Sequence, residues 1–123
     1  MQEKIIKTEN IGTEVDWTTK KNSQLINAIL KLENPIEVEN FFRDLMTMAE
    51  ISEFANRLEA ASLLSRDVQY NSIIESTGLS SATIARISKW LKGSLGGYRL
   101  VLSRLSNHHS NHSKLRKGLS LNT

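Results

Sequence analysis

Basic side chains are the residues of this sequence with the clearest chemical purpose, and they gather in its C-terminal half. Residues 69–123 contain one acid, Glu75, whereas residues 1–47 (six basic, eight acidic) and 48–68 (two basic, four acidic) each carry a charge of −2. Eight basic residues bring the charge of the C-terminal half to +7: Arg86, Lys89, Lys92, Arg99, Arg104, Lys114, Arg116 and Lys117. This polarity favours a polyanionic partner, because each phosphate contact releases counterions. A solvated basic tail on an ordinary helical domain would give the same distribution.

Side chains suited to catalysis or metal binding are few. The chain has no cysteine, which excludes a thiol nucleophile, a thiolate metal site and a disulfide framework. The only histidines, His108, His109 and His112, lie in a polar segment without carboxylates, so we expect a solvated linker there. Carboxylate pairs such as Glu37 and Glu39 fall on polar helical faces. We therefore expect no catalytic residue, no metal, no cofactor and no enzymatic activity.

A helix-turn-helix pattern occupies about residues 69–92. Gly78 can adopt the positive φ that a tight turn between two helices requires, and either Ser80 or Ser81 can cap the second helix. Apolar residues flank the turn where crossed helices must touch, namely Ile73, Ile74, Ile84, Ile87, Trp90 and Leu91. The pattern predicts a second helix that can enter the major groove of DNA. An ordinary two-helix corner would have the same spacing.

The elements that must position this unit are also helical. Residues 25–32 form an apolar stripe, and Asn34 with Pro35 is typical of the start of a second helix. Thr47 and Glu50 have the spacing of a capping box that begins a third helix. We expect that helix to end at Arg66 and Asp67, the glycine-rich segment 93–97 to end the recognition helix, and a last helix to cover 98–105. No stretch shows sustained two-residue alternation, so the predicted fold is all-α.

Length and composition suit one domain in a chain of 123 residues with 39% hydrophobic and 24% charged residues. We expect an N-terminal arm over 1–17, a helical DNA-binding domain over 18–105, and a basic, disordered tail over 106–123. The N-terminus has no signal-peptide pattern and no apolar run is long enough to span a bilayer. A cytoplasmic location without a membrane partner is the expectation.

Four motifs between residues 20 and 105 form a specific combination. They are Phe41-Phe42-Arg43-Asp44-Leu45-x-Thr47, Arg57, Thr77-Gly78-x-Ser80-x-Ala82-Thr83-Ile84-x-Arg86 and Gly96-Gly97-Tyr98-x-Leu100-Val101-Leu102. Together they resemble the Trp repressor superfamily, and most closely its Trp-repressor-like (YerC/YecD) subgroup. The resemblance implies an intertwined, all-helical homodimer that binds operator DNA through a helix-turn-helix.

The resemblance also implies which residues contact DNA. These positions are Tyr70 and Asn71 before the turn, Ser80, Ser81, Ala82 and Ala85 in the recognition helix, and Lys92 at a phosphate. The residue types select the same surface, and they add Lys89 as a second cation near the DNA backbone. Because few of these side chains can form bidentate contacts with bases, we expect readout through water, methyl groups and DNA shape.

Three further residues match the family's corepressor site and are candidate effector-binding residues: Thr47, Arg57 and Arg86. In the tryptophan-binding member a glycine lies under the indole ring. Here that position is Ile87, whose branched side chain would occupy the space of the ring, which argues against tryptophan. Each match also has a structural explanation, since Thr47 belongs to a capping box, Arg57 follows Glu53 by one helical turn, and Arg86 could contact phosphate.

The N-terminal helices give a physical reason for a dimer. These segments offer too little apolar surface to one another to bury all of their large apolar residues within one chain: Trp17, Leu25, Ile29, Phe41 and Phe42. Exchange of these segments between two protomers would complete a core, although packing within one chain is the alternative.

The sequence thus predicts a homodimeric transcriptional regulator, a repressor, whose partner is double-stranded DNA. Two alternatives stay open. One is a helix-turn-helix module that docks on a protein, which the large side chain of Ile74 and the modest polarity of the recognition helix would suit. The other is a regulator that senses a small molecule other than tryptophan, to which Arg57 and Arg86 point. Residues 114–117 would add either DNA affinity or solubility.

Overall fold

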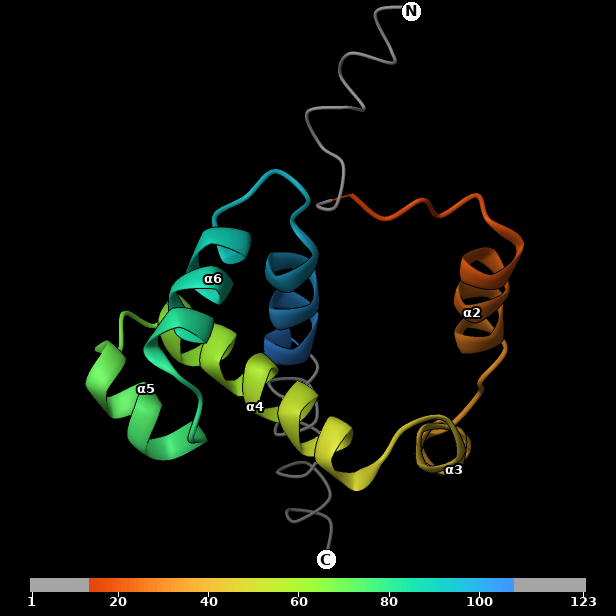
Figure 1. The fold of residues 1–123 in the computed structure, drawn as a ribbon, viewed down its shortest axis with the longest axis horizontal. Coiled ribbons are helices and arrows are strands. Elements are labelled where there is room, and N and C mark those ends of the chain that lie inside the picture. Colours follow the sequence, from red (N-terminus) through yellow and green to blue (C-terminus); the bar gives the residue numbers. More distant parts are fainter. Residues whose placement is uncertain (1–13, 108–123) are drawn as a thin grey trace, which may run out of the picture. The chain divides into compact units, whose positions relative to one another are not determined.

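The computed structural model describes residues 14–107, and every regular element in that range is a helix (Figure 1). The predicted tail over 108–123, with the three histidines and residues 114–117, lies outside the described range, as does most of the predicted arm. The chain forms two compact units, residues 1–46 and 47–123, and we describe each separately. Within the described range no helix is long and apolar enough to cross a membrane.

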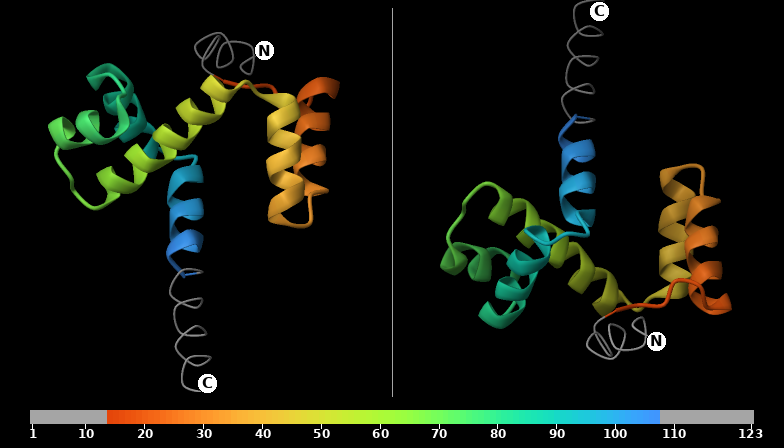
Figure 2. Two further views of the ribbon diagram at one scale, coloured as in Figure 1. Left: turned by 90° about the horizontal axis from the view of Figure 1, so that it is seen from below. Right: turned by 90° about the horizontal axis from the view of Figure 1, so that it is seen from above.

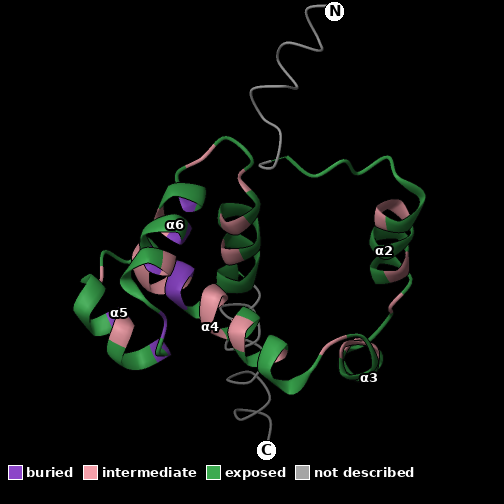
Figure 3. Cartoon of the chain, viewed as in Figure 1, coloured by how far each residue is buried: buried purple, intermediate pink, exposed green. Residues whose placement is uncertain are grey.

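The first unit contains α2 (Lys20–Leu30) and α3 (Pro35–Leu45). The Thr19 hydroxyl accepts a hydrogen bond from the Asn22 amide at 3.2 Å and caps α2. The Asn34 side chain accepts one from the Glu37 amide at 3.0 Å and caps α3, and Pro35 follows as its first residue, which confirms the prediction. No residue of either helix is buried within the chain (Figure 3).

The second unit begins with α4 (Met48–Ser65), and its predicted capping box is present. The Glu50 amide donates to the Thr47 hydroxyl at 3.1 Å, while the Glu50 carboxylate accepts from the Thr47 amide at 2.9 Å. The helix ends at Arg66 as predicted. Asp67 follows in the left-handed region at φ 60°, and the Val68 amide bonds back to the Leu63 carbonyl at 3.1 Å, which closes a Schellman turn.

Three helices complete this unit: α5 (Tyr70–Thr77), α6 (Ser81–Leu91) and a helix over residues 97–107. Both α5 and α6 pack against α4, and Figure 2 shows them beside its C-terminal half. The buried core consists of residues from α4, α5, α6 and the turn between α5 and α6: Ala60, Ala61, Ile73, Leu79, Ile84 and Ile87. The two alanines of α4 leave room for the isoleucines of α5 and α6, and Tyr98 and Leu102 of the last helix pack against the same core.

Candidate nucleic-acid interface

The turn between α5 and α6 has the geometry that the sequence predicts. Gly78 ends α5 at φ 73°, and its amide donates to the Ile74 carbonyl at 2.8 Å. No heavy atom outside its chain neighbours lies within 4 Å of the position of a Cβ atom on Gly78, so backbone conformation alone requires glycine there. Ile74 is half-buried and packs against the core, and its size does not prevent the two helices from meeting.

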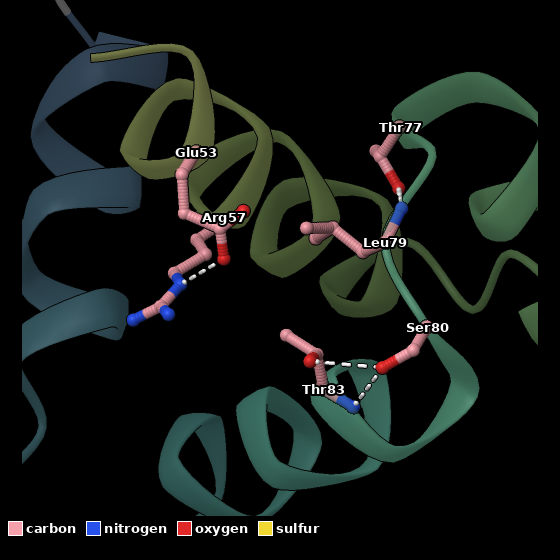
Figure 4. Close-up of polar contacts among 6 residues, drawn as sticks. All are labelled: Glu53, Arg57, Thr77, Leu79, Ser80 and Thr83. Carbon is pink, nitrogen blue, oxygen red and sulfur yellow. Dashed lines mark hydrogen bonds and ion pairs between the residues drawn. The ribbon is translucent and has the colours of Figure 1, made fainter. Parts of the chain in front are cut away.

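Thr77 stabilises this turn through side-chain hydrogen bonds, a role that was not predicted from the sequence. Its hydroxyl donates to the Ile73 carbonyl at 2.7 Å. The same oxygen accepts from the Leu79 amide at 3.3 Å (Figure 4). Thr77 is the buried polar residue of the described core, and both of these bonds serve backbone groups near the end of α5. A threonine immediately before the turn glycine is the signal that could have identified it.

The N-terminus of α6 resolves the choice between the two predicted caps. Ser80 is the N-cap, and its side-chain oxygen accepts from the Thr83 amide at 3.1 Å and lies 3.0 Å from the Thr83 hydroxyl (Figure 4). The Ser80 hydroxyl therefore caps the N-terminus of α6. Ser81 is the first residue of α6 and is exposed, so its hydroxyl can face a ligand.

The outward face of α6 holds three of the eight predicted DNA-contacting residues, Ala82, Ala85 and Lys89. Ile84, Ile87 and Leu91 bury one face of the helix in the core. The residues of the opposite face are exposed, and each lies three or four positions from two of the others, so they form one strip along the helix: Ala82, Ala85, Arg86 and Lys89. The strip begins with two methyl groups and continues with long cations. A helix of this design can come close to a surface at its N-terminus and reach outward with charge further along.

The other predicted contacts flank this strip. Lys92 is the C-cap of α6 and is exposed, and Tyr70 and Asn71 are exposed in the first turn of α5. All eight predicted DNA-contacting residues are thus accessible. The charge is also suitable, because Glu75 is the one acidic residue between 69 and 107, whereas five residues in that range are cationic.

The candidate effector residues have separate local roles in the chain. The Arg57 Nε donates to Glu53 at 3.0 Å (Figure 4). Its guanidinium lies 5.7 Å from the centre of the Phe54 ring. Thr47 caps α4 ten residues earlier, a rise of about 15 Å along the helix, so it does not join Arg57 in one site within this unit. Arg86 is exposed on α6. Ile87, at the position of the family's glycine, is completely buried in the core.

Two groups near the candidate effector residues Thr47 and Arg57 have shifted pKa values, the Glu50 carboxyl and the Tyr98 phenol. Hydrogen bonds from the Thr47 backbone and side chain hold the pKa of the Glu50 carboxyl below its usual value. Burial raises the pKa of the Tyr98 phenol, and the positive charge of Arg57 opposes that rise. Among residues 14–107 no group of histidine, cysteine and carboxylate side chains could hold a metal ion. Glu50 and Tyr98 do not shift the pKa of one another, so they do not form a general acid–base pair.

An apolar groove beside α6 is a second feature that the sequence analysis missed. It has a volume of about 630 Å³, and its walls include Leu58 of α4, Trp90 of α6 and Val101 of the last helix. Leu95, in the glycine-rich connection, also lines the groove and is 95% exposed. A large exposed leucine between glycines could have indicated this groove, but only if the positions of its three helices were known.

The chain is similar to known proteins over most of this region. The sequence profile of the Trp repressor protein family matches residues 20–106. The uncharacterised protein YerC of Bacillus subtilis strain 168 is 40% identical over 86 residues, which covers 70% of this chain and 83% of YerC.

Two crystal structures share the fold. A TrpR-like protein from Eubacterium eligens ATCC 27750 is 38% identical with a TM-score of 0.69, over 73% of this chain and 93% of that one. A proposed Trp repressor from Staphylococcus aureus is 31% identical, also with a TM-score of 0.69, over 76% of this chain and 96% of that one.

Proposed function

The chain belongs to the Trp repressor family, in its YerC-like group, and from that premise we propose that it is a transcriptional repressor that binds operator DNA as a homodimer. Family membership makes it a regulatory, non-enzymatic protein with an all-α, Trp-repressor-like fold. DNA binding, the direction of regulation and the dimer belong to the proposal.

The observation that carries the proposal is the exposed strip of α6. Ala82 and Ala85 would face base edges, where a short side chain allows the helix to enter the major groove and a methyl group can contact thymine. Lys89 and Lys92 would neutralise phosphates, and Tyr70 and Asn71 would contact the backbone from α5. Ser80 would contribute through the helix terminus that it caps, and Ser81 through its exposed hydroxyl.

The dimer is supported by apolar surface that the chain does not bury. In α2, Leu25, Ile26 and Ile29 are each about two-fifths exposed, and Leu30 is 74% exposed. Trp17, just before α2, is 56% exposed, while Phe41 and Phe42 of α3 are half-buried. A second copy would cover this surface and would set two recognition helices about 34 Å apart, the distance between successive major grooves.

The proposal needs no tryptophan. Ile87 fills its place in the core completely, so a ring could enter there only if the core opened. Thr47, Arg57 and Arg86 remain candidates for an effector of another kind. In this proposal the domain over residues 18–105 binds DNA by itself, and residues 1–17 and 106–123 are not required for binding.

Selection of fragmented genomic DNA on the full-length protein, without added ligand and at near-physiological salt, tests this function. We expect recovery of a short, near-palindromic sequence. Lys89→Glu combined with Lys92→Glu should then weaken binding and lower the slope of log affinity against log salt by about one unit for each lysine that contacts a phosphate.

Lys20→Glu combined with Lys21→Glu is the matched control, because it changes the net charge equally at exposed positions of α2. We expect its salt slope to stay close to that of the original protein. Equal effects of the two double variants would mean that net charge matters and the α6 surface does not. Recovery of no sequence above background would contradict the proposal, and a stable complex with another protein would then support the docking alternative.

A further inference from the structure

Arg99 joins the last helix to the end of α6. It lies in the first turn of the helix over 97–107, and its Nη1 donates to the Leu91 carbonyl at 2.5 Å and to the Gly93 carbonyl at 2.8 Å. Leu91 is the last residue of α6, and Gly93 lies just beyond its C-cap. One guanidinium group therefore binds the C-terminus of the recognition helix from another helix.

Both partners of this contact favour it. The last carbonyl groups of a helix have no partner within the helix, and they carry the negative end of the helix dipole. A guanidinium group supplies fixed N–H donors and a permanent positive charge. Contacts of this type are stronger than hydrogen bonds between neutral groups, although the partial exposure of Arg99 lets water compete.

The glycine-rich connection between α6 and the last helix leaves space for the Arg99 side chain at Gly96. Gly96 adopts φ 72°, and a Cβ atom placed on it would lie 3.2 Å from Nη2 of Arg99. A side chain at this position would thus be strained by its backbone conformation and would also press on the guanidinium. The glycine and the arginine form one local arrangement.

The two helices that Arg99 joins face different partners under the proposed function. On the last helix, Tyr98 and Leu102 pack against the core, while Leu100, Val101 and Leu105 are about half exposed and available to a second copy. On α6, the exposed strip faces DNA. Arg99 is the polar contact between the helix that can meet the other protomer and the helix that can meet the operator.

We propose that Arg99 is a positioning residue that fixes the direction of α6 in each protomer, and so sets the half-site spacing that the dimer accepts. This inference rests on the proposed function. Arg99 acts through the two carbonyl groups at the end of α6 and touches neither bases nor phosphates. Without it, the end of α6 would be held by apolar packing alone, and each recognition helix could turn to follow a shifted half-site.

Arg99→Gln, Arg99→Lys and Arg104→Gln in the full-length protein test the inference. Arg104 is the matched control, because it is exposed on the same helix and forms no hydrogen bond or ion pair with any residue from 14 to 107. Affinity is measured for the operator recovered by genomic selection, and for the same operator with one base pair inserted between its half-sites. The insertion shifts one half-site by about 3.4 Å along the duplex and also rotates it.

We expect the original protein and Arg104→Gln to lose affinity on the order of a hundredfold when the base pair is inserted. Arg99→Gln should bind the original operator about tenfold more weakly, and should lose less than about tenfold on insertion. Arg99→Lys, which can still donate to a carbonyl, should restore part of the preference for spacing. A role in stability alone would lower the melting temperature and leave this preference unchanged.

Three outcomes would overturn the inference. Arg99→Gln could retain the spacing preference of Arg104→Gln. It could lower the salt slope by about one unit with an unchanged preference, which would identify a phosphate contact instead. The third outcome is an original protein that binds no duplex sequence, in which case the proposed function fails as well. In the first two outcomes DNA binding stands and only the role of Arg99 is lost.

Discussion

The helices α4, α5 and α6 enclose completely buried residues within one chain, whereas α2 and α3 enclose none. Local sequence signals are equally good in both regions, since each has side-chain caps and an amphipathic pattern. Helices of 11 residues are marginal in water by themselves, so α2 and α3 must obtain their stability from packing. Caps and periodicity therefore specify where helices form, while burial shows which of them form a core within their own chain.

The largest effect should come from the core of the second unit. Ile84→Ala removes a completely buried side chain between α4 and α6, and should lower the free energy of unfolding by about 3 kcal/mol. Urea titrations at several protein concentrations measure this loss, which should be the same at each concentration because the cavity lies inside one chain. A loss that varied with concentration would place Ile84 in an interface and remove the contrast between the two regions.

A smaller effect, visible in assembly, should follow from α2. Ile29→Gln makes a partly exposed apolar residue polar, and should raise the dimer dissociation constant about tenfold if a second copy covers this face. Sedimentation over a range of concentrations measures the constant. Lys21→Gln on the same helix is the control and should leave it unchanged. An unaltered constant in Ile29→Gln would mean that α2 finds its packing partner elsewhere.

The start of α4 provides a test of local signals. Thr47→Ala removes the hydroxyl of the capping box, and should lower the free energy of unfolding by about 1 kcal/mol at neutral pH. Thermal unfolding measures the change. If Thr47 acted only as an effector ligand, Thr47→Ala would leave stability unchanged.

The same cap should make stability depend on pH. Because the pKa of Glu50 is lowered in the folded chain, its contribution is present above the usual carboxyl range and is lost as the pH falls through the lowered value. The advantage of the original protein over Glu50→Gln should therefore shrink between about pH 7 and pH 3. A constant difference over that range would contradict this account of the cap.

The smallest effect should be a gain. Asp67 holds a left-handed conformation at the end of α4, where glycine has no steric penalty, so Asp67→Gly should raise the free energy of unfolding by about 0.5–1 kcal/mol. Asp67→Ala is the control, because it removes the carboxylate but keeps the unfavourable φ. If Asp67→Gly were not more stable than Asp67→Ala, backbone conformation would not be the reason.

Sequence reasoning succeeded where a feature depends on residues close together in the chain. The cap at Asn34, the capping box at Thr47 and the turn at Gly78 were predicted and are present. The Glu53–Arg57 ion pair, which the spacing offered as one explanation of Arg57, is present as well. Each depends on backbone geometry within one helical turn, so residue type and spacing are sufficient. The order of the helices, predicted from periodicity and caps, contributed to the family resemblance, and two solved relatives share the fold with TM-scores of 0.69.

Features that join distant segments could not be predicted in this way. The bonds of Arg99 to Leu91 and Gly93 depend on the path of a glycine-rich connection, and the apolar groove depends on where three helices meet. A motif comparison treats Thr47, Arg57 and Arg86 as one set. Within a single chain these three residues have separate roles. The motif comparison could not reveal this, because it carries no information about which chain supplies each residue.

The hydroxyl of Thr77 has a kinetic consequence. By bonding both the Ile73 carbonyl and the Leu79 amide, it keeps the connection to α6 ordered while the protein is free in solution. A partner that meets a preorganised recognition helix loses little conformational entropy on docking, and its association need not wait for a loop to fold. The Leu79 amide should then exchange its hydrogen slowly in the unbound protein, at a rate that a bound partner scarcely changes.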